Sequence, residues 1–277
     1  MKGFVVKITR LKWWLDLVAP HICRGCGALG TVLCECCKNN ILRERVEICP
    51  SCKQRLDKAA ARCGDKRREV NADAAEVRAV CEECELPFER LRVVGWREGL
   101  LKRLVEEYKY QGVRELDAAL AELALAVMGE VGENVVVVPL PTIGRHVRQR
   151  GLDHTWRLAR EMARRKGWEC RRVLRRAKDT VQVGAKQAVR EMQARGAYET
   201  TERLEAGRVY LLVDDVWTTG ASMRAAAEVM RMAGATRLMG VVLATGRPKA
   251  EGAAGGDDGL MKDYGDGAAE VAQKAQK

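Results

Sequence analysis

Two adjacent carboxylates followed by a turn rich in hydroxyl groups form the part of this sequence best suited to binding a ligand. Asp214 and Asp215 come directly after the apolar run 208–213, RVYLLV, which we predict to be a buried strand. We predict a helix over 220–233, so that the turn lies at the carboxyl edge of a sheet, where α/β proteins bind ligands. The residues of the predicted site in this turn are Thr218, Thr219, Gly220, Ala221 and Ser222.

The chemistry of this turn suits a ligand that carries a phosphate at one end and a diol at the other. Backbone N–H groups at a helix start, together with hydroxyl groups, bind anions, and Gly220 lets the backbone approach a phosphate closely. Carboxylates suit the vicinal hydroxyls of a ribose, or a divalent ion held with it. The whole run therefore favours a ribose 5-phosphate ligand over the competing interpretation, an N-capped helix whose acidic residues only favour the helix dipole.

Cysteine spacing indicates a metal-binding module near the start of the chain. Ten of the eleven cysteines precede residue 85, and eight of them form C-x-x-C pairs. A gap of two residues lets both thiolates of a pair reach one metal ion at roughly 2.3 Å. The predicted zinc ligands are Cys23 with Cys26, Cys34 with Cys37, Cys49 with Cys52, and Cys81 with Cys84.

Four such pairs satisfy two tetrahedral zinc sites, and both sequential and interleaved pairing fit the spacing. Closed all-thiolate sites leave no position for a substrate, so we expect this zinc to fold the module and not to do chemistry. Redox use of a C-x-x-C pair is the alternative, but it needs one pair at a helix start rather than four in a segment with few large apolar residues. Cys36 and Cys63 are spare, and either could replace a neighbouring ligand.

Strands and helices alternate over the second half of the chain. We predict strands over 134–139, 208–213 and 237–244, and helices over 153–166 and 220–233. This order is typical of an α/β fold with a parallel sheet. Before it, the sequence predicts a strand over 91–96 and helices over 98–110 and 115–128.

Composition divides the chain into four parts and excludes a membrane span. We predict a helix over 1–20, a double zinc-ribbon module over 21–85, the α/β domain over 86–248 and a disordered tail over 249–277. No apolar run approaches the roughly 18–20 residues of a membrane span, and the first part lacks the pattern of a signal peptide. We therefore expect a cytoplasmic protein.

Positive charge is concentrated in one stretch of the α/β domain. The formal net charge is +11, and residues 143–195 alone hold 16 Lys or Arg against 5 Asp or Glu. A basic face implies an anionic partner, either phosphate groups or nucleic acid. The alternative is a solvated helical surface. Trp156 and Trp168 flank the stretch and could stack on bases, although core packing is the commoner role.

The run DDVWTTGAS resembles the phosphoribosyl pyrophosphate motif of type I phosphoribosyltransferases. This resemblance implies that Asp214 and Asp215 bind the ribose hydroxyls and that residues 218–222 bind the 5′-phosphate. It also implies that the loop after the strand 134–139 holds pyrophosphate. That loop contains Arg145, Arg148 and Arg150, as an anion site requires.

The order of these parts resembles the ComF family of bacterial competence-type proteins, from about Pro20 to Thr245. The resemblance implies a type I phosphoribosyltransferase-like parallel sheet behind a double zinc ribbon, and a link to DNA uptake. It also implies a mobile basic hood around 174–182 and Arg190. Where the family commonly has Phe-Asn-Gln after Arg-Gly, this chain has Leu, Asp153 and His154, and Gln193 replaces a family asparagine.

The resemblance implies two functions from different classes. The first is phosphoribosyl transfer or its reverse, with Mg²⁺ on the pyrophosphate, and with Asp214, Asp215 and Arg150 as the catalytic residues. The second is a non-catalytic module that senses a phosphoribosyl ligand or contacts single-stranded DNA or DNA-uptake proteins. Asp153 would repel a pyrophosphate unless Mg²⁺ intervenes, and His154 is either a general acid or a helix-surface residue.

Overall fold

The computed structural model describes residues 21–44, 46, 49–52, 84, 86–142, 144, 151–177 and 196–248. Several sequence-based predictions lie outside these residues. They are the helix over 1–20, the tail over 249–277, most of the hood with Arg190 and Gln193, the ligand Cys81, and the loop arginines Arg145, Arg148 and Arg150.

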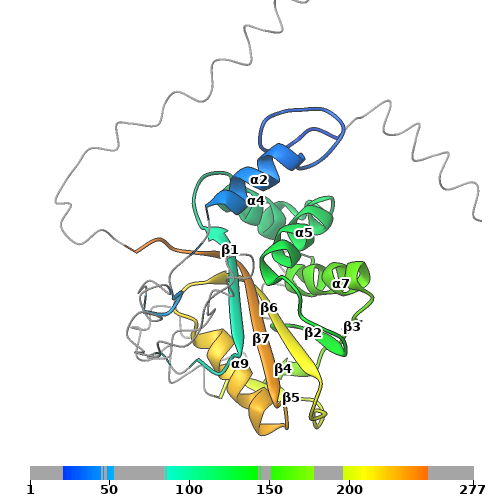
Figure 1. Ribbon diagram of the computed structural model, residues 1–277, viewed down its shortest axis with the longest axis vertical. Helices are drawn as coiled ribbons and strands as arrows, with labels where there is room; N and C mark the ends of the chain where they lie inside the picture. Colours follow the sequence, from blue (N-terminus) through cyan, green and yellow to red (C-terminus); the bar gives the residue numbers. More distant parts are fainter. Residues whose placement is uncertain are drawn as a thin grey trace, which may run out of the picture. The chain divides into compact units, whose positions relative to one another are not determined.

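The described chain is built around one sheet of five parallel strands, which confirms the predicted α/β class (Figure 1). The strand order is β1-β7-β6-β2-β3, and every neighbouring pair is parallel. β6 and β7 are the longest strands and lie at its centre, next to β2, as expected for apolar β-branched runs. The strands are β1 Arg90–Trp96, β2 Val135–Pro139, β3 Glu169–Cys170, β6 Val209–Trp217 and β7 Arg237–Thr245.

The strand that carries the carboxylates is longer than the sequence predicts. β6 does not end at Val213 but stays in register with β7 through Trp217, which lies opposite Thr245. The apolar pattern stops at Asp214, so a prediction from hydrophobicity ends the strand there. Pairing with β7 continues the strand to Trp217, so both carboxylates lie within β6 rather than after it.

Helices cover both faces of the sheet. Leu211 and Val213 of β6 belong to the core that includes α4, α5 and α7, whereas Tyr210 and Leu212 belong to the core with α9 (Figure 1). Among the described residues, no helix combines the length and apolar character needed to cross a bilayer. The helices are α2 Glu35–Arg43, α4 Gly99–Glu106, α5 Leu116–Met128, α7 His154–Lys166 and α9 Ala221–Met232.

A short π-helix interrupts what the sequence predicts as one helix over 98–110. α4 ends at Glu106, and η3, Glu107–Gln111, continues it with a wider turn that ends at the left-handed Gly112. The Tyr108 hydroxyl fixes this turn, because it donates to Asp117 Oδ1 at 2.7 Å and lies 2.9 Å from the His154 carbonyl oxygen. Such turns occur often at functional sites.

The described residues of the cysteine module share the core of the sheet. Cys23, Leu33, Cys37 and Ile41 are buried in the same apolar cluster as α4, α5 and the strands. α2 lies beside α4 in Figure 1 and contacts both β1 and α5. A short antiparallel ladder, β4 Leu174–Arg176 with β5 Tyr198–Thr200, lies next to α9 on the other face.

Candidate functional site

The two neighbouring carboxylates have different surroundings. Successive residues of a strand point to opposite faces of a sheet. Asp215 faces η3 and α7, where Lys109 Nζ lies 2.8 Å from its Oδ1 and His154 Nε2 contacts its Oδ2. Asp214 interacts electrostatically with Tyr198 and Arg176 of the β4–β5 ladder. The carboxylates that the sequence assigns together to a ribose are therefore not equivalent.

Asp215 is held ionised by its two partners. Burial raises its pKa, but the hydrogen bond from His154 and the charge of Lys109 lower it more, to about 2. Both oxygens of this carboxylate are engaged, one by each partner. Asp215 thus fixes the end of β6 against η3 and α7.

Asp214 behaves in the opposite way. Burial raises its pKa, and the negative charge of Asp215 raises it further, to about 8. The Asp215 backbone N–H donates to Asp214 Oδ1 at 2.8 Å, which offsets only part of this effect. A carboxyl group that is costly to ionise, at the carboxyl end of a central strand, is a feature of ligand sites.

The contacts of Lys109 and His154 with Asp215 are not predicted by the sequence. His154 is 4% exposed, so its interpretation as a helix-surface residue is wrong. Asp153 caps α7 by accepting from the Trp156 backbone N–H at 3.1 Å, and it pairs with Arg172 at 3.2 Å. The only signal for Lys109 is its position just before Gly112, and no local pattern reveals its partner 106 residues away.

The predicted phosphate turn lies directly between β6 and α9. Gly220 has a φ of 76° and begins α9, and the Ala221 backbone N–H donates to Thr219 Oγ1 at 3.4 Å. Thr218 is exposed, and Ser222 hydrogen-bonds Tyr198 of β5. Ser222 of the turn and Asp214 therefore both interact with Tyr198 of the β4–β5 ladder.

The structure gives a reason for Gly220 other than approach to a phosphate. A Cβ atom at this position would lie 2.0 Å from the ring of Trp217, which is 1% exposed. The indole occupies the space that a side chain would need, so packing alone requires glycine here. A substitution of Gly220 therefore tests stability before it tests binding.

We expect Gly220→Ala to destabilise the protein by about 2–5 kcal/mol. About 1–2 kcal/mol comes from the left-handed backbone and about 1–3 kcal/mol from overpacking against Trp217. Gly207→Ala is the matched control, because Gly207 has a φ of 84° and nothing within 4 Å of its Cβ position. Urea unfolding of both variants measures the difference. Equal losses in the two variants would contradict the role assigned to Trp217.

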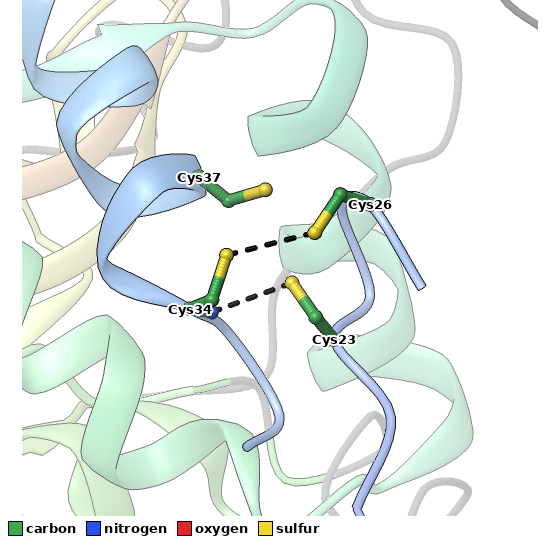
Figure 2. Close-up of side chains that lie close together, drawn as sticks. All are labelled: Cys23, Cys26, Cys34 and Cys37. Atoms are coloured by element: carbon green, nitrogen blue, oxygen red, sulfur yellow. Dashed lines mark hydrogen bonds between the residues drawn. The ribbon is translucent and has the colours of Figure 1, made fainter. Parts of the chain in front are cut away.

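The first cysteine cluster has the geometry of a zinc site (Figure 2). The sulfur atoms of Cys23, Cys26, Cys34 and Cys37 lie within 4.8 Å of one another, and those of Cys26 and Cys34 are 3.6 Å apart. Tetrahedral zinc with bonds of about 2.3 Å separates its sulfurs by about 3.8 Å, whereas a disulfide bond is about 2 Å long. The donor set therefore fits zinc.

Backbone N–H groups support this cluster. Those of Cys34 and Gly25 donate to the Cys23 sulfur at 3.3 and 3.4 Å. Burial raises the pKa of the Cys23 thiol, but the backbone hydrogen bonds lower it more, to about 6. A thiolate favoured in this way is ready to bind a cation.

A second cluster forms from Cys49, Cys52 and Cys84, whose sulfurs also lie within 4.8 Å of one another. The Cys49 and Cys84 sulfurs are 3.8 Å apart. The predicted fourth ligand, Cys81, lies outside the described residues. Of the two pairings that the spacing allows, the described cysteines show the sequential one. Cys36 belongs to neither cluster.

In the described part of the basic stretch, arginines form ion pairs with acidic side chains. The guanidinium of Arg172 also lies 4.3 Å from the ring centroid of Trp156, and Trp168 packs against the core. These contacts show a basic surface that is balanced locally by acidic side chains. The pairs include Arg164 with Glu161, Arg165 with Glu122, Arg171 with Glu202, Arg172 with Asp153 and Arg175 with Glu199.

Two solved structures are similar to part of this chain. One is the allosteric regulatory enzyme of purine biosynthesis, with 21% identity and a TM-score of 0.35. The other is glutamine phosphoribosylpyrophosphate amidotransferase from B. subtilis in complex with ADP and GMP, with 22% identity and a TM-score of 0.34. Each match covers 50% of this chain and 30% of the solved chain, so no functional argument rests on it. No protein-family model and no curated protein matches the chain.

We expect Lys109→Met to destabilise the protein at neutral pH by about 1.5–3 kcal/mol, because it removes a charged partner from a largely buried carboxylate. The lowered pKa of Asp215 contributes stability above about pH 4, and this stability is lost as the pH falls towards 2. The variant should therefore unfold in acid at a higher pH than the parent. Lys102→Met, at an exposed position of α4, is the control. Identical acid unfolding of both variants would contradict this role.

Proposed function

We propose that this chain binds phosphoribosyl pyrophosphate with Mg²⁺ at the carboxyl edge of its sheet, as a type I phosphoribosyltransferase-like protein of the ComF kind. The observation that carries the proposal is the placement of Asp214. Its pKa is raised by burial, and it lies in the carboxyl-terminal half of the central strand β6, a few residues before the turn that begins α9. Ionising this carboxyl group in the folded protein costs free energy, and a ligand that uses the carboxylate explains why the protein tolerates that cost.

Different residues bind different groups of the ligand. Asp214 accepts hydrogen bonds from the ribose hydroxyls, and Asp215 holds β6 in place through Lys109 and His154. Backbone N–H groups and hydroxyls of residues 218–222 bind the 5′-phosphate. Arg145, Arg148 and Arg150, which lie outside the described residues, bind the pyrophosphate.

Oxygen ligands suit Mg²⁺, and the acidic donor that fits it here is Asp214. When bound, Mg²⁺ supplies positive charge that neutralises the pyrophosphate. The chain's own contribution to transfer is electrostatic. A carboxylate beside the ribose stabilises positive charge as it develops on the anomeric carbon.

The alternative, single-stranded DNA binding through the basic stretch, has less support. Five of the arginines that suggested it are paired with carboxylates, and Arg172 covers one face of Trp156. A phosphate backbone would have to displace these partners. The proposal therefore places the anionic partner at the turn before α9, and a link to DNA uptake rests on the ComF resemblance alone.

Incubation with phosphoribosyl pyrophosphate and Mg²⁺ tests the proposal. Binding is measured by isothermal titration, and pyrophosphate release is followed against a panel of purine and pyrimidine bases. Release with one base supports a transferase, whereas binding without release supports a sensor of the same ligand. Absence of binding by the folded, zinc-loaded protein would contradict both.

A further inference from the structure

A single arginine joins the second cysteine cluster to the predicted phosphate turn. Arg224 lies one turn into α9. Its Nη1 donates to Ser51 Oγ at 2.8 Å, and its Nη2 donates to the Thr219 carbonyl oxygen at 2.8 Å. Residues 51 and 224 are 173 positions apart in the sequence. The contact therefore connects two functional regions that no local motif relates.

Ser51 is itself attached to the metal-binding cysteines. It lies between Cys49 and Cys52, and its hydroxyl hydrogen-bonds the sulfur of Cys84. A hydroxyl can donate once while it accepts from a second group. Ser51 thus donates to a cluster sulfur and accepts from Arg224. The resulting chain of hydrogen bonds runs from Cys84 through Ser51 and Arg224 to Thr219.

The hydrogen bond from Arg224 to the Thr219 carbonyl oxygen sets the direction of the Gly220 backbone N–H group in the turn. Because a trans peptide is planar, the Thr219 carbonyl and the Gly220 N–H point in opposite directions. Arg224 holds the carbonyl on its own side, and the Gly220 N–H then points away from the guanidinium. The planar fork of an arginine fixes both acceptors at once, which a lysine ammonium does not do with the same geometry.

We infer that zinc at the cluster of Cys49, Cys52 and Cys84 and phosphate at the turn before α9 bind cooperatively, with Ser51 and Arg224 as the positioning residues between them. The inference rests on the proposed function, because it takes the turn as the phosphate site. Zinc fixes the cysteines, the cysteines fix Ser51, and Ser51 holds Arg224 against the turn. Coupling of this kind is reciprocal, so a bound phosphate also retains the zinc.

Ribose 5-phosphate is the probe for this coupling, because it lacks the pyrophosphate group that chelates zinc. We expect Ser51→Ala to weaken its binding about 5-fold or more in isothermal titration, and Arg224→Lys to weaken it at least as much. The double variant should add little, because both changes break one chain of hydrogen bonds. Thr31→Ala is the matched control. Its hydroxyl contacts the Leu33 carbonyl oxygen at 3.3 Å within the first cysteine segment, so its affinity should equal that of the parent.

Zinc release provides the readout that a purely structural role would not change. With a chromophoric chelator in excess, ribose 5-phosphate should slow the loss of one zinc equivalent from the parent protein and from Thr31→Ala, but not from Ser51→Ala. Unchanged ribose 5-phosphate affinity in Ser51→Ala overturns the coupling and leaves the proposed function standing. Failure of the zinc-loaded parent to bind ribose 5-phosphate overturns both.

Discussion

Asp214→Asn should lower the affinity for phosphoribosyl pyrophosphate by about 10- to 150-fold, and it should also make the ligand-free protein more stable. The loss of affinity corresponds to one charge-assisted hydrogen bond, worth about 1.5–3 kcal/mol. An amide keeps the shape of the carboxylate but not its charge. Isothermal titration in the presence of Mg²⁺ measures the first effect.

The gain in stability follows from the pKa of Asp214, which is raised from 3.8 to about 8. The folded protein binds this proton more tightly than the unfolded chain, so stability falls as the pH rises from about 4 to about 8. Asparagine removes this dependence. The variant should therefore be more stable than the parent at pH 8, and similar to it near pH 4. Glu228→Gln, the same change of charge at an exposed position of α9, is the control.

Asp215→Asn should have the opposite effect on stability. Its pKa is lowered by His154 and Lys109 against the effect of burial, so the ionised form stabilises the fold at neutral pH and asparagine loses that contribution. Thermal unfolding at pH 7 separates the two variants. If both substitutions destabilise the protein equally and leave the affinity for phosphoribosyl pyrophosphate unchanged, the two carboxylates have only a structural role in β6 and the ligand site lies elsewhere.

The parts of the site that the sequence predicts are those whose signal is local. The apolar run before Asp214 predicts a strand, although β6 continues to Trp217, and the following hydroxyls and Gly220 predict a turn into a helix, as the structure has it. The C-x-x-C spacing likewise predicts the clusters. The residues of the turn are adjacent in the sequence, and each C-x-x-C pair is local, although the pairs that combine in a cluster lie up to 35 positions apart.

The parts that the sequence does not predict depend on contacts between distant residues. Lys109 reaches Asp215 from the π-helix that follows α4, and the buried His154 at the start of α7 contacts the same carboxylate. The role of Gly220 depends on the orientation of the Trp217 ring. Hydrophobic periodicity carries no information about these contacts, since it reports which face is apolar and not what lies against it.

In the cysteine module too, the sequence predicts the local feature but not the contacts with distant residues. Spacing predicts zinc ligands but not that Cys23 and Cys37 are buried in the core of the sheet together with Leu33 and Ile41. A cysteine module packed separately from the sheet would leave the α/β domain intact when its zinc is removed. The shared core predicts that the loss of zinc reaches the sheet as well.

We therefore expect the purified protein to contain about two zinc ions and to lose its cooperative thermal unfolding when a strong chelator removes them. Structural zinc sites contribute apparent free energies of about 10–16 kcal/mol, as large as the about 5–15 kcal/mol that stabilise a typical domain. Elemental analysis measures the zinc, and circular dichroism during heating measures the unfolding.

Cys26→Ser and Cys36→Ser provide the matched comparison, because both residues are exposed in the same segment but only Cys26 belongs to a cluster. Cys26→Ser should lose one zinc ion and much of the stability, whereas Cys36→Ser should keep both. Protein without zinc, but with disulfide bonds between these cysteines, would show that the clusters are not metal sites. If chelation left the unfolding temperature of the α/β domain unchanged, the buried side chains of Cys23 and Cys37 would hold the module in place without metal.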